Sequence, residues 1–156
     1  MNDSSRWTRR SVMALPVALA AAWRPSWAQA PSFEVYRDPL CGCCGGWVDH
    51  LKAAGYAVSV EERSDLTPLK RQLAIPESLW SCHTATVAGY AIEGHVPAHA
   101  LARLLDERPA LRGLAVPGMP IGSPGMEGDR EELYEVVGFD GGRRIRFGRY
   151  RGNRQV

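Results

Sequence analysis

The feature that most constrains the fold is a strand–helix–strand pattern in residues 33–61. Residues 33–37 alternate between apolar and polar side chains, which is typical of a strand, and residues 56–61 alternate again. Between them, apolar residues recur at helical spacing from Trp47 to Ala54, and Gly55 is a typical residue to end a helix. This order predicts a right-handed crossover and parallel pairing of the two strands.

The rest of the chain alternates between helical and strand patterns. Asp65 is placed to cap a short helix that ends before Pro76. Pro97 fits the first position of a further helix, whose leucines continue to about Glu107. Two hairpins are expected, one from residues 84–87 with 90–93 and one from residues 134–139 with 144–150. Together these elements predict an α/β domain with a central mixed sheet and flanking helices.

The first 28 residues have the features of a bacterial secretory signal peptide. Arg9 and Arg10 precede an apolar run at residues 12–22, which is too short to span a bilayer, and residues 26–28 form a small-x-small cleavage site. The paired arginines favour the twin-arginine export route, with the general secretory route as the alternative. An uncleaved membrane anchor is a further alternative, although Arg24 and Pro25 interrupt the apolar run. We therefore predict a signal peptide at residues 1–28, one domain at residues 29–156 and export to the periplasm.

The charge balance excludes some classes of partner. The chain has 19 basic and 17 acidic residues, and residues 1–28 contain four arginines and one aspartate, so 15 basic and 16 acidic residues remain in the predicted domain. A near-neutral domain gives no reason to expect nucleic acid or an acidic membrane surface as a partner. The basic run at residues 143–154 is interpreted as the solvated face of a terminal strand, with a patch for an anionic partner as the alternative.

All four cysteines lie in the predicted domain, and Cys41, Cys43 and Cys44 fall within four positions where the first strand meets the first helix. A disulfide framework would spread its cysteines along the chain, so this clustering indicates chemistry. The N–H groups and dipole at a helix N-terminus favour thiolates. Cys41 and Cys44 have CxxC spacing, which suits either a reversible disulfide or one soft metal ion. Cys43 adds a third thiolate, which favours a metal–thiolate site.

Ligand softness favours copper among the metals. Thiolates and thioethers select Cu(I), zinc or iron–sulfur clusters. An iron–sulfur cluster is not expected outside the cytoplasm, and a structural zinc site more often pairs two CxxC units. Residues 113–128, which we call the Gly/Pro loop, form a long segment of a kind that is often functional. This loop carries Met119 and Met126, whose thioethers favour copper; packing within the loop is their alternative role.

A second group of candidate ligands precedes the first hairpin. In a thioredoxin-like topology the residues just before the third strand lie beside the start of the first helix, so Cys82 and His83 are expected to face the three cysteines. Taken alone, Cys82 would be interpreted as a buried apolar side chain and His83 as a surface residue. For His95, a turn or capping role and ligation have equal weight. His50 and His99 are expected to face solvent.

Four motifs resemble, in the same order, those of the CopG-type periplasmic proteins: YRDPLCGCC at residues 36–44, SCHTA at 81–85, EGHVP at 93–97 and GMPIGSPGME at 118–127. These proteins are thioredoxin-like domains that occur with bacterial copper-resistance systems. The resemblance implies a CxCC copper site at the N-terminus of the first helix, with either one Cu(I) ion or several bridged by sulfur, and a role in copper handling or Cu(I)/Cu(II) redox. The ligands that it implies are Cys41, Cys43, Cys44, Cys82, His83, Met119 and Met126, and it extends less directly to His95.

Two functions from different classes stay open. The first is a periplasmic copper-binding protein, acting as a buffer, a chaperone or a copper-linked oxidoreductase, with copper ions and other periplasmic copper-handling proteins as partners. The second is a thiol–disulfide oxidoreductase, with Cys41 as the nucleophile and Cys44 as the resolving thiol. Cys43 and the two methionines favour the first. A purely structural disulfide between Cys41 and Cys44 is the remaining alternative, although its short ring gives little entropic stabilisation.

Overall fold

The computed structural model describes residues 31–156. The predicted signal peptide at residues 1–28 lies outside the described residues, so its cleavage and its export route stay predictions. Within residues 31–156, no helix combines the length and the apolar composition that crossing a lipid bilayer requires.

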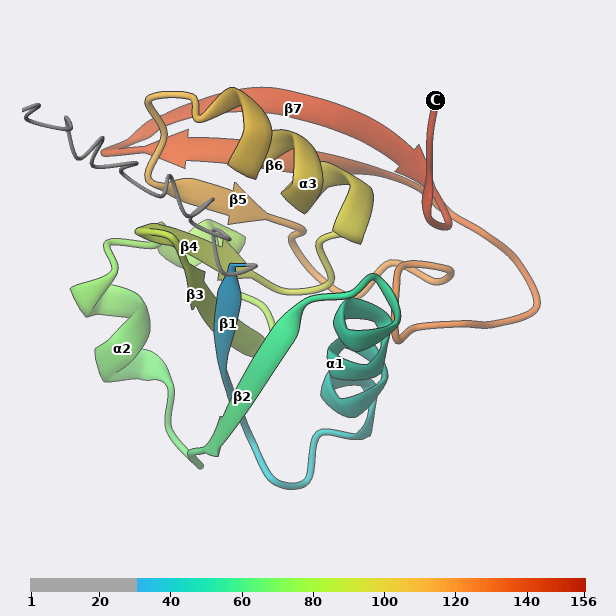
Figure 1. Cartoon of the computed structure of the whole chain (residues 1–156), viewed down its shortest axis with the longest axis horizontal. Helices are drawn as coiled ribbons and strands as arrows, with labels where there is room; N and C mark the ends of the chain where they lie inside the picture. The colour runs from blue at the N-terminus through green and yellow to red at the C-terminus, as the bar shows by residue number, and fades with distance from the viewer. Residues whose placement is uncertain (1–30) are drawn as a thin grey trace, which may run out of the picture.

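Eight strands form one mixed sheet in the order β2-β1-β3-β4-β5-β6-β7-β8 (Figure 1). The pairs β1–β2 and β4–β5 are parallel, and the other neighbouring pairs are antiparallel. The parallel pairing predicted for the first two strands is therefore confirmed. The strands are β1 (Ser32–Arg37), β2 (Ala57–Glu62), β3 (His83–Val87), β4 (Tyr90–Glu93), β5 (Gly113–Ala115), β6 (Leu133–Asp140), β7 (Arg143–Arg151) and β8 (Arg154–Gln155).

Helices cover both faces of this sheet. Figure 1 shows α1 (Gly42–Ala53) and α3 (Ala98–Glu107) on one side and α2 (Thr67–Gln72) on the other. Because side chains alternate along a strand, neighbouring residues of β4 enter different cores. Ile92 packs into the main core with residues of α1 and α3, whereas Ala91 packs into a smaller core with residues around the short 3₁₀ helix η1 (Glu77–Leu79).

Both predicted hairpins are present. The turn between β3 and β4 is made by Ala88 and Gly89, whose φ angles are 48° and 86°. Two successive positive φ angles are typical of the tight turn that matches the twist of a hairpin. The turn between β6 and β7 uses Gly141 and Gly142, which also have positive φ angles.

The structure differs from the sequence-based expectations at four boundaries. The N-cap residue of α2 is Leu66 rather than Asp65, although the Asp65 carboxylate accepts from the Thr67 N–H over 2.8 Å. Helix α1 begins at Gly42 rather than after the glycines, so Cys43 and Cys44 lie inside its first turn. Pro97 is the N-cap residue of α3, one position before the helix. The Gly/Pro loop begins as strand β5, which at three residues is too short to show alternation. A Cβ atom at Gly113 would lie 1.8 Å from the Ala91 carbonyl oxygen, so this glycine permits the close approach of β5 to β4.

Candidate metal centre

The end of β1 and the first turn of α1 position three cysteines. The Cys41 N–H donates to the Asp38 carbonyl over 3.0 Å, and the Arg37 guanidinium donates to the Cys41 carbonyl over 3.2 Å. Cys41 is the N-cap residue of α1, and the first turn contains no acidic side chain. The unpaired N–H groups and the dipole at this helix end therefore favour a negatively charged group bound there.

Four sulfur atoms converge at this helix end. The Sγ atoms of Cys41, Cys43, Cys44 and Cys82, which we call the sulfur group, all lie within 4.8 Å of one another. A disulfide joins Cys41 to Cys44, whereas Cys43 and Cys82 are free thiols. The Cys43 Sγ lies 3.5 Å from the Cys41 Sγ and 4.0 Å from the Cys82 Sγ. The structure thus brings Cys82 to the cysteines of α1, as the order of the elements predicts.

Two imidazoles approach Cys82 from the side of β3 and β4. The Cys82 Sγ lies 3.3 Å from His83 Nδ1 and 3.2 Å from His95 Nε2, and we call these three residues the nitrogen group. His95 Nδ1 lies 2.8 Å from the Pro124 carbonyl oxygen, which can only accept a hydrogen bond. Nδ1 therefore carries the proton and Nε2 presents a lone pair toward Cys82. This is the arrangement that orients histidine ligands in metal sites.

His83 is completely buried, so its interpretation as a surface residue is wrong. Its ring lies 4.5 Å from the Trp47 ring and 4.9 Å from the His95 ring, between centroids. Burial lowers the pKa of His83 well below its usual value, and the nearby His95 and Lys70 lower it further. The imidazole is therefore neutral, which is the form that binds metals. Among the described residues, His83 Nε2 is one of two buried side-chain polar atoms without a hydrogen-bond partner.

Burial also acts on the other members of the nitrogen group. Burial, followed by the charge of the neighbouring Cys43, raises the pKa of Cys82 to about 11. Burial lowers the pKa of His95, against an opposing effect of its hydrogen bond to Pro124. At neutral pH, metal-free Cys82 is therefore a thiol, and it must release its proton when it binds a metal.

The Gly/Pro loop lies against both groups through its backbone. The Ser81 hydroxyl donates to the Gly118 carbonyl over 2.9 Å, and the Pro124 carbonyl accepts from His95. Gly125 packs on the first turns of α1 so closely that a Cβ atom there would lie 2.5 Å from the Cys43 carbonyl oxygen. The loop therefore contacts the backbone at Cys43 and the Ser81 side chain next to Cys82.

The two methionines of this loop have different surroundings. Met119 is 52% exposed and directly follows Gly118. Met126 is partly buried and lines a shallow cavity with Ile121 and Arg130. The contacts of the cysteine sulfurs described above involve neither thioether, so ligation by Met119 and Met126 stays a prediction.

Of the two remaining histidines, one is exposed to solvent and the other has a structural contact. His99 is exposed, as expected. His50 is partly buried, and its Nε2 accepts a hydrogen bond of 3.0 Å from the Ala98 N–H at the start of α3. The expectation that His50 faces solvent is wrong, because its ring turns toward the start of α3 and accepts one of the N–H groups that a helix leaves unpaired at its N-terminus. Its role is to cap α3.

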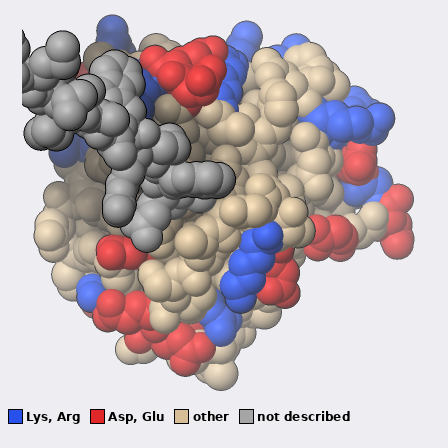
Figure 2. Space-filling view, viewed as in Figure 1, with Lys and Arg blue, Asp and Glu red and all other residues tan. Residues whose placement is uncertain are grey.

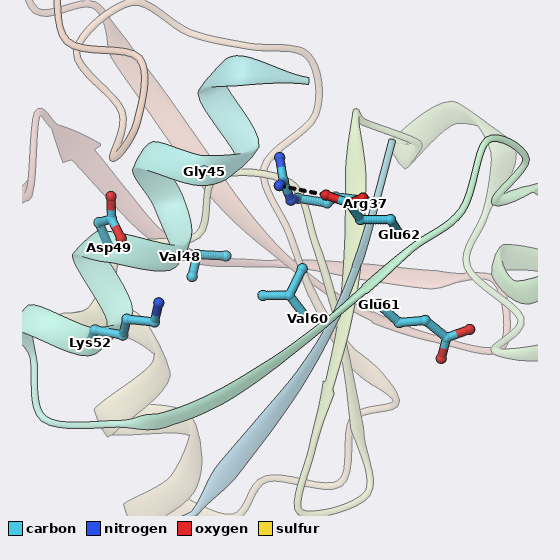
Figure 3. A pocket seen from close by; sticks show the side chains of 8 residues that line it. All are labelled: Arg37, Gly45, Val48, Asp49, Lys52, Val60, Glu61 and Glu62. Atoms are coloured by element: carbon cyan, nitrogen blue, oxygen red, sulfur yellow. Dashed lines mark hydrogen bonds and ion pairs between the residues drawn. The ribbon is translucent and has the colours of Figure 1, made fainter. Parts of the chain in front are cut away.

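A surface groove lies beside the sulfur group but does not contain it. This groove of about 600 Å³ runs between α1 and β2, and its lining contains none of the cysteines (Figure 3). Arg37 stands at its edge, where it pairs with Glu62 over 2.9 Å and also donates to the Cys41 carbonyl. On the face seen in Figure 2, acidic and basic side chains are interspersed.

The donor atoms fit a soft metal ion. The two groups together offer four sulfurs and two imidazoles, and neither group contains a carboxylate. Thiolate and imidazole ligands suit copper and zinc, whereas magnesium and calcium require oxygen ligands. The pre-set tautomer of His95, whose Nε2 lone pair faces Cys82, agrees with a site built to hold an ion.

Comparisons with known proteins agree with this chemistry. A family model described as a protein of unknown function, DUF411, matches residues 79–126, which include the nitrogen group and most of the Gly/Pro loop. Two solved structures, both described as copper resistance protein CopG, are also similar. Form 2 is 44% identical, with a TM-score of 0.74 over 78% of this chain and 99% of that chain. Form 1 is 45% identical, with a TM-score of 0.72 over 76% of this chain and 96% of that chain. No curated protein matches the chain.

Proposed function

Because this chain belongs to the family of copper resistance protein CopG, we propose that it is an exported protein that binds Cu(I) in copper resistance or homeostasis. The sulfur group supports a copper-related role, since thiolates are the ligands that Cu(I) prefers. In this proposal Cys41, Cys43, Cys44 and Cys82 are the principal ligands. His83 and His95 complete the set, and Met119 and Met126 assist from the loop.

One observation carries the proposal. Cys82 belongs to both groups, with the Cys43 Sγ at 4.0 Å and the two imidazole nitrogens at 3.3 Å and 3.2 Å. A thiolate in such a position can bridge ions held on its two sides. This arrangement favours more than one Cu(I) ion over a single ion, because six donors exceed what one Cu(I) ion takes.

The proposed site requires that the disulfide be reduced. As a disulfide, Cys41 and Cys44 cannot act as thiolate ligands, and only Cys43 and Cys82 remain as thiols. An external dithiol that is itself oxidised to a disulfide would supply the two electrons and two protons, and would return Cys41 and Cys44 to the end of α1 as potential ligands. Copper would supply a one-electron Cu(I)/Cu(II) couple, and the buried imidazoles of His83 and His95 would hold it on the side away from solvent.

A thiol–disulfide oxidoreductase is the second candidate, and the Cys41–Cys44 disulfide favours it. Cys41 is partly exposed and Cys44 is buried, as an attacking and a resolving thiol should be. The order β1-α1-β2-α2-β3-β4-α3, with β2, β1, β3 and β4 adjacent in the sheet, also supports a thioredoxin-like domain. Cys43 argues against this function, since its sulfur lies 3.5 Å from that of Cys41 and would compete with substrate thiols.

Metal analysis of the reduced protein tests the proposal. Protein purified without oxygen should bind Cu(I) with loss of its four titratable thiols, and Cys43→Ser should lower the copper stoichiometry without unfolding the domain. Reduced protein that takes up no Cu(I) while all four thiols remain titratable would contradict it. Rapid reduction of insulin disulfides by the metal-free protein, unchanged in Cys43→Ser, would instead favour the oxidoreductase.

A further inference from the structure

A buried ion pair lies directly behind the nitrogen group. Lys70 of α2 is 5% exposed and Glu93 at the end of β4 is 0% exposed, and the Lys70 ammonium donates to the Glu93 carboxylate. Both charged groups have been taken out of water, which costs free energy unless every polar atom finds a partner.

The hydrogen bonds of this pair are complete. The Lys70 ammonium has three protons, and it donates them to Glu93, to the Thr84 hydroxyl over 2.9 Å and to the Ser81 carbonyl over 3.1 Å. The Glu93 carboxylate also accepts from the Ser81 N–H over 2.6 Å and from the Thr84 hydroxyl over 2.7 Å. Both backbone polar groups of Ser81 are therefore bound by the pair.

These contacts fix one residue shortly before Cys82 and another shortly before His95. Ser81 immediately precedes Cys82, and Glu93 lies two residues before His95. Thr84 and Glu93 are register partners across β3 and β4. The ion pair therefore joins α2 to the two chain segments whose side chains meet at the 3.2 Å contact between Cys82 Sγ and His95 Nε2.

Stability alone does not account for such a pair. A buried ion pair is often no more stabilising than well-packed apolar side chains of the same volume. Unlike apolar packing, the hydrogen bonds of an ion pair are directional, so they restrict the positions of the atoms that they join. Outer-shell contacts of this kind orient metal ligands.

We propose that Lys70 and Glu93 are positioning residues, which hold the Ser81–Cys82 segment at the distance from His95 that the site requires. This inference rests on the proposed function for its consequence in copper binding. Its geometric part, the placement of Cys82, holds for the metal-free protein as well.

The variants Lys70→Met and Lys70→Met with Glu93→Gln test the proposal. The double variant leaves no unpaired charge in the interior, so it remains available if the single variant fails to fold. Arg71→Met is the matched control, because Arg71 is the next residue of α2 and forms an exposed pair with Glu77. Circular dichroism and urea unfolding establish that each variant is folded.

Two measurements then separate positioning from simple stabilisation. In competition with the chelator bicinchoninate, the Lys70 variants should bind Cu(I) about 10- to 100-fold more weakly than wild type, as expected for loss of an outer-shell contact. In reduced, metal-free protein, the rate of Cys82 alkylation by iodoacetamide should rise while the rate at Cys43 stays at the wild-type value. Arg71→Met should match wild type in both measurements.

A folded double variant with wild-type Cu(I) affinity and wild-type Cys82 alkylation would overturn the proposal and leave the pair a purely structural role. If wild-type protein itself binds no Cu(I), the proposed function fails, and the alkylation rates alone decide whether the pair places Cys82.

Discussion

The close contact between the Gly/Pro loop and α1 gives a quantitative prediction at Gly125. This residue has a φ angle of +83°, and a Cβ atom there would lie 2.5 Å from the Cys43 carbonyl oxygen and 2.6 Å from the Trp47 nitrogen. These neighbours are backbone atoms of a helix, which cannot move aside as a flexible side chain could. Gly125→Ala therefore adds a steric clash to the cost of a positive φ angle.

Gly118 of the same loop serves as a control that separates the cost of the positive φ angle from the cost of the steric clash. Its φ angle is +72°, but a Cβ atom there would meet nothing within 4 Å. Gly118→Ala should cost about 1–2 kcal/mol of unfolding free energy, from the left-handed backbone alone. Gly125→Ala should cost that amount and about 1–3 kcal/mol more from overpacking.

Urea unfolding followed by circular dichroism measures the difference. With a slope of about 2 kcal/mol per molar urea, the additional cost lowers the midpoint of Gly125→Ala by about 0.5–1.5 M relative to Gly118→Ala. Local detachment of the loop would limit this loss, and would then appear as faster hydrogen exchange in the first turns of α1. Equal midpoints together with unchanged exchange would refute the reasoning that Gly125 holds the loop against the cysteines.

Three further predictions concern single residues. In the metal-free protein with the Cys41–Cys44 disulfide intact, Cys82 alkylation by iodoacetamide, followed by mass spectrometry, should keep accelerating to about pH 11, because burial and Cys43 raise its pKa to about 11. Because the pKa of Cys82 is raised in the folded state, its contribution to the stability of the fold is fully present below the usual thiol pKa of about 8.5 and is lost as the pH rises toward 11. Cys43→Ser should lower the pH at which the alkylation rate of Cys82 is half its maximum. Gly45→Ala, which meets nothing within 4 Å, should raise the unfolding free energy by about 1 kcal/mol in urea, and a loss would show that α1 needs this glycine. His50→Ala should cost about 1 kcal/mol by removing the cap of α3, whereas the same change at exposed His99 should cost less than about 0.5 kcal/mol; equal losses would argue against capping.

The sequence predicts local features of this fold well, since alternation and helical spacing depend on neighbouring residues. The parallel pairing of β1 and β2 and both hairpins follow from such patterns. Strand β5 could not be predicted in this way, because its three residues are defined by their partners β4 and β6. Its one local signal is Gly113, whose close approach to Ala91 is visible only in three dimensions.

In the candidate site, too, the features that depend on neighbouring residues could be predicted, and those that depend on contacts between distant residues could not. The spacing of Cys41, Cys43 and Cys44 is a local signal, and the order of the elements was enough to place Cys82 near them. The burial of His83 and the tautomer of His95 depend on distant contacts, with Trp47 and Pro124 respectively. Sequence patterns carry no such signal.

Lys70 and Glu93 show most clearly what sequence patterns cannot predict. A lysine in a short helix followed by Arg71 has the pattern of a solvated face, and a glutamate at the end of a hairpin has no pattern at all. Their pairing spans 23 positions and becomes apparent only when α2 lies beside the end of β4. A buried charge that sequence patterns assign to the surface is therefore the kind of functional residue that requires a structure.

The contacts of the Gly/Pro loop also bear on how copper would reach the site. The loop is held through the carbonyls of Gly118 and Pro124 and through the packing of Gly125, so it lies against the residues of the site without using their sulfur atoms. The thiols of Cys43 and Cys82 remain partly exposed and free as ligands. Met119 directly follows one of these contacts and is 52% exposed, so its side chain is open to solvent. Under the proposed function, Met119→Leu should therefore slow the uptake of Cu(I) more than it lowers the final stoichiometry, because the four cysteines of the sulfur group are unchanged.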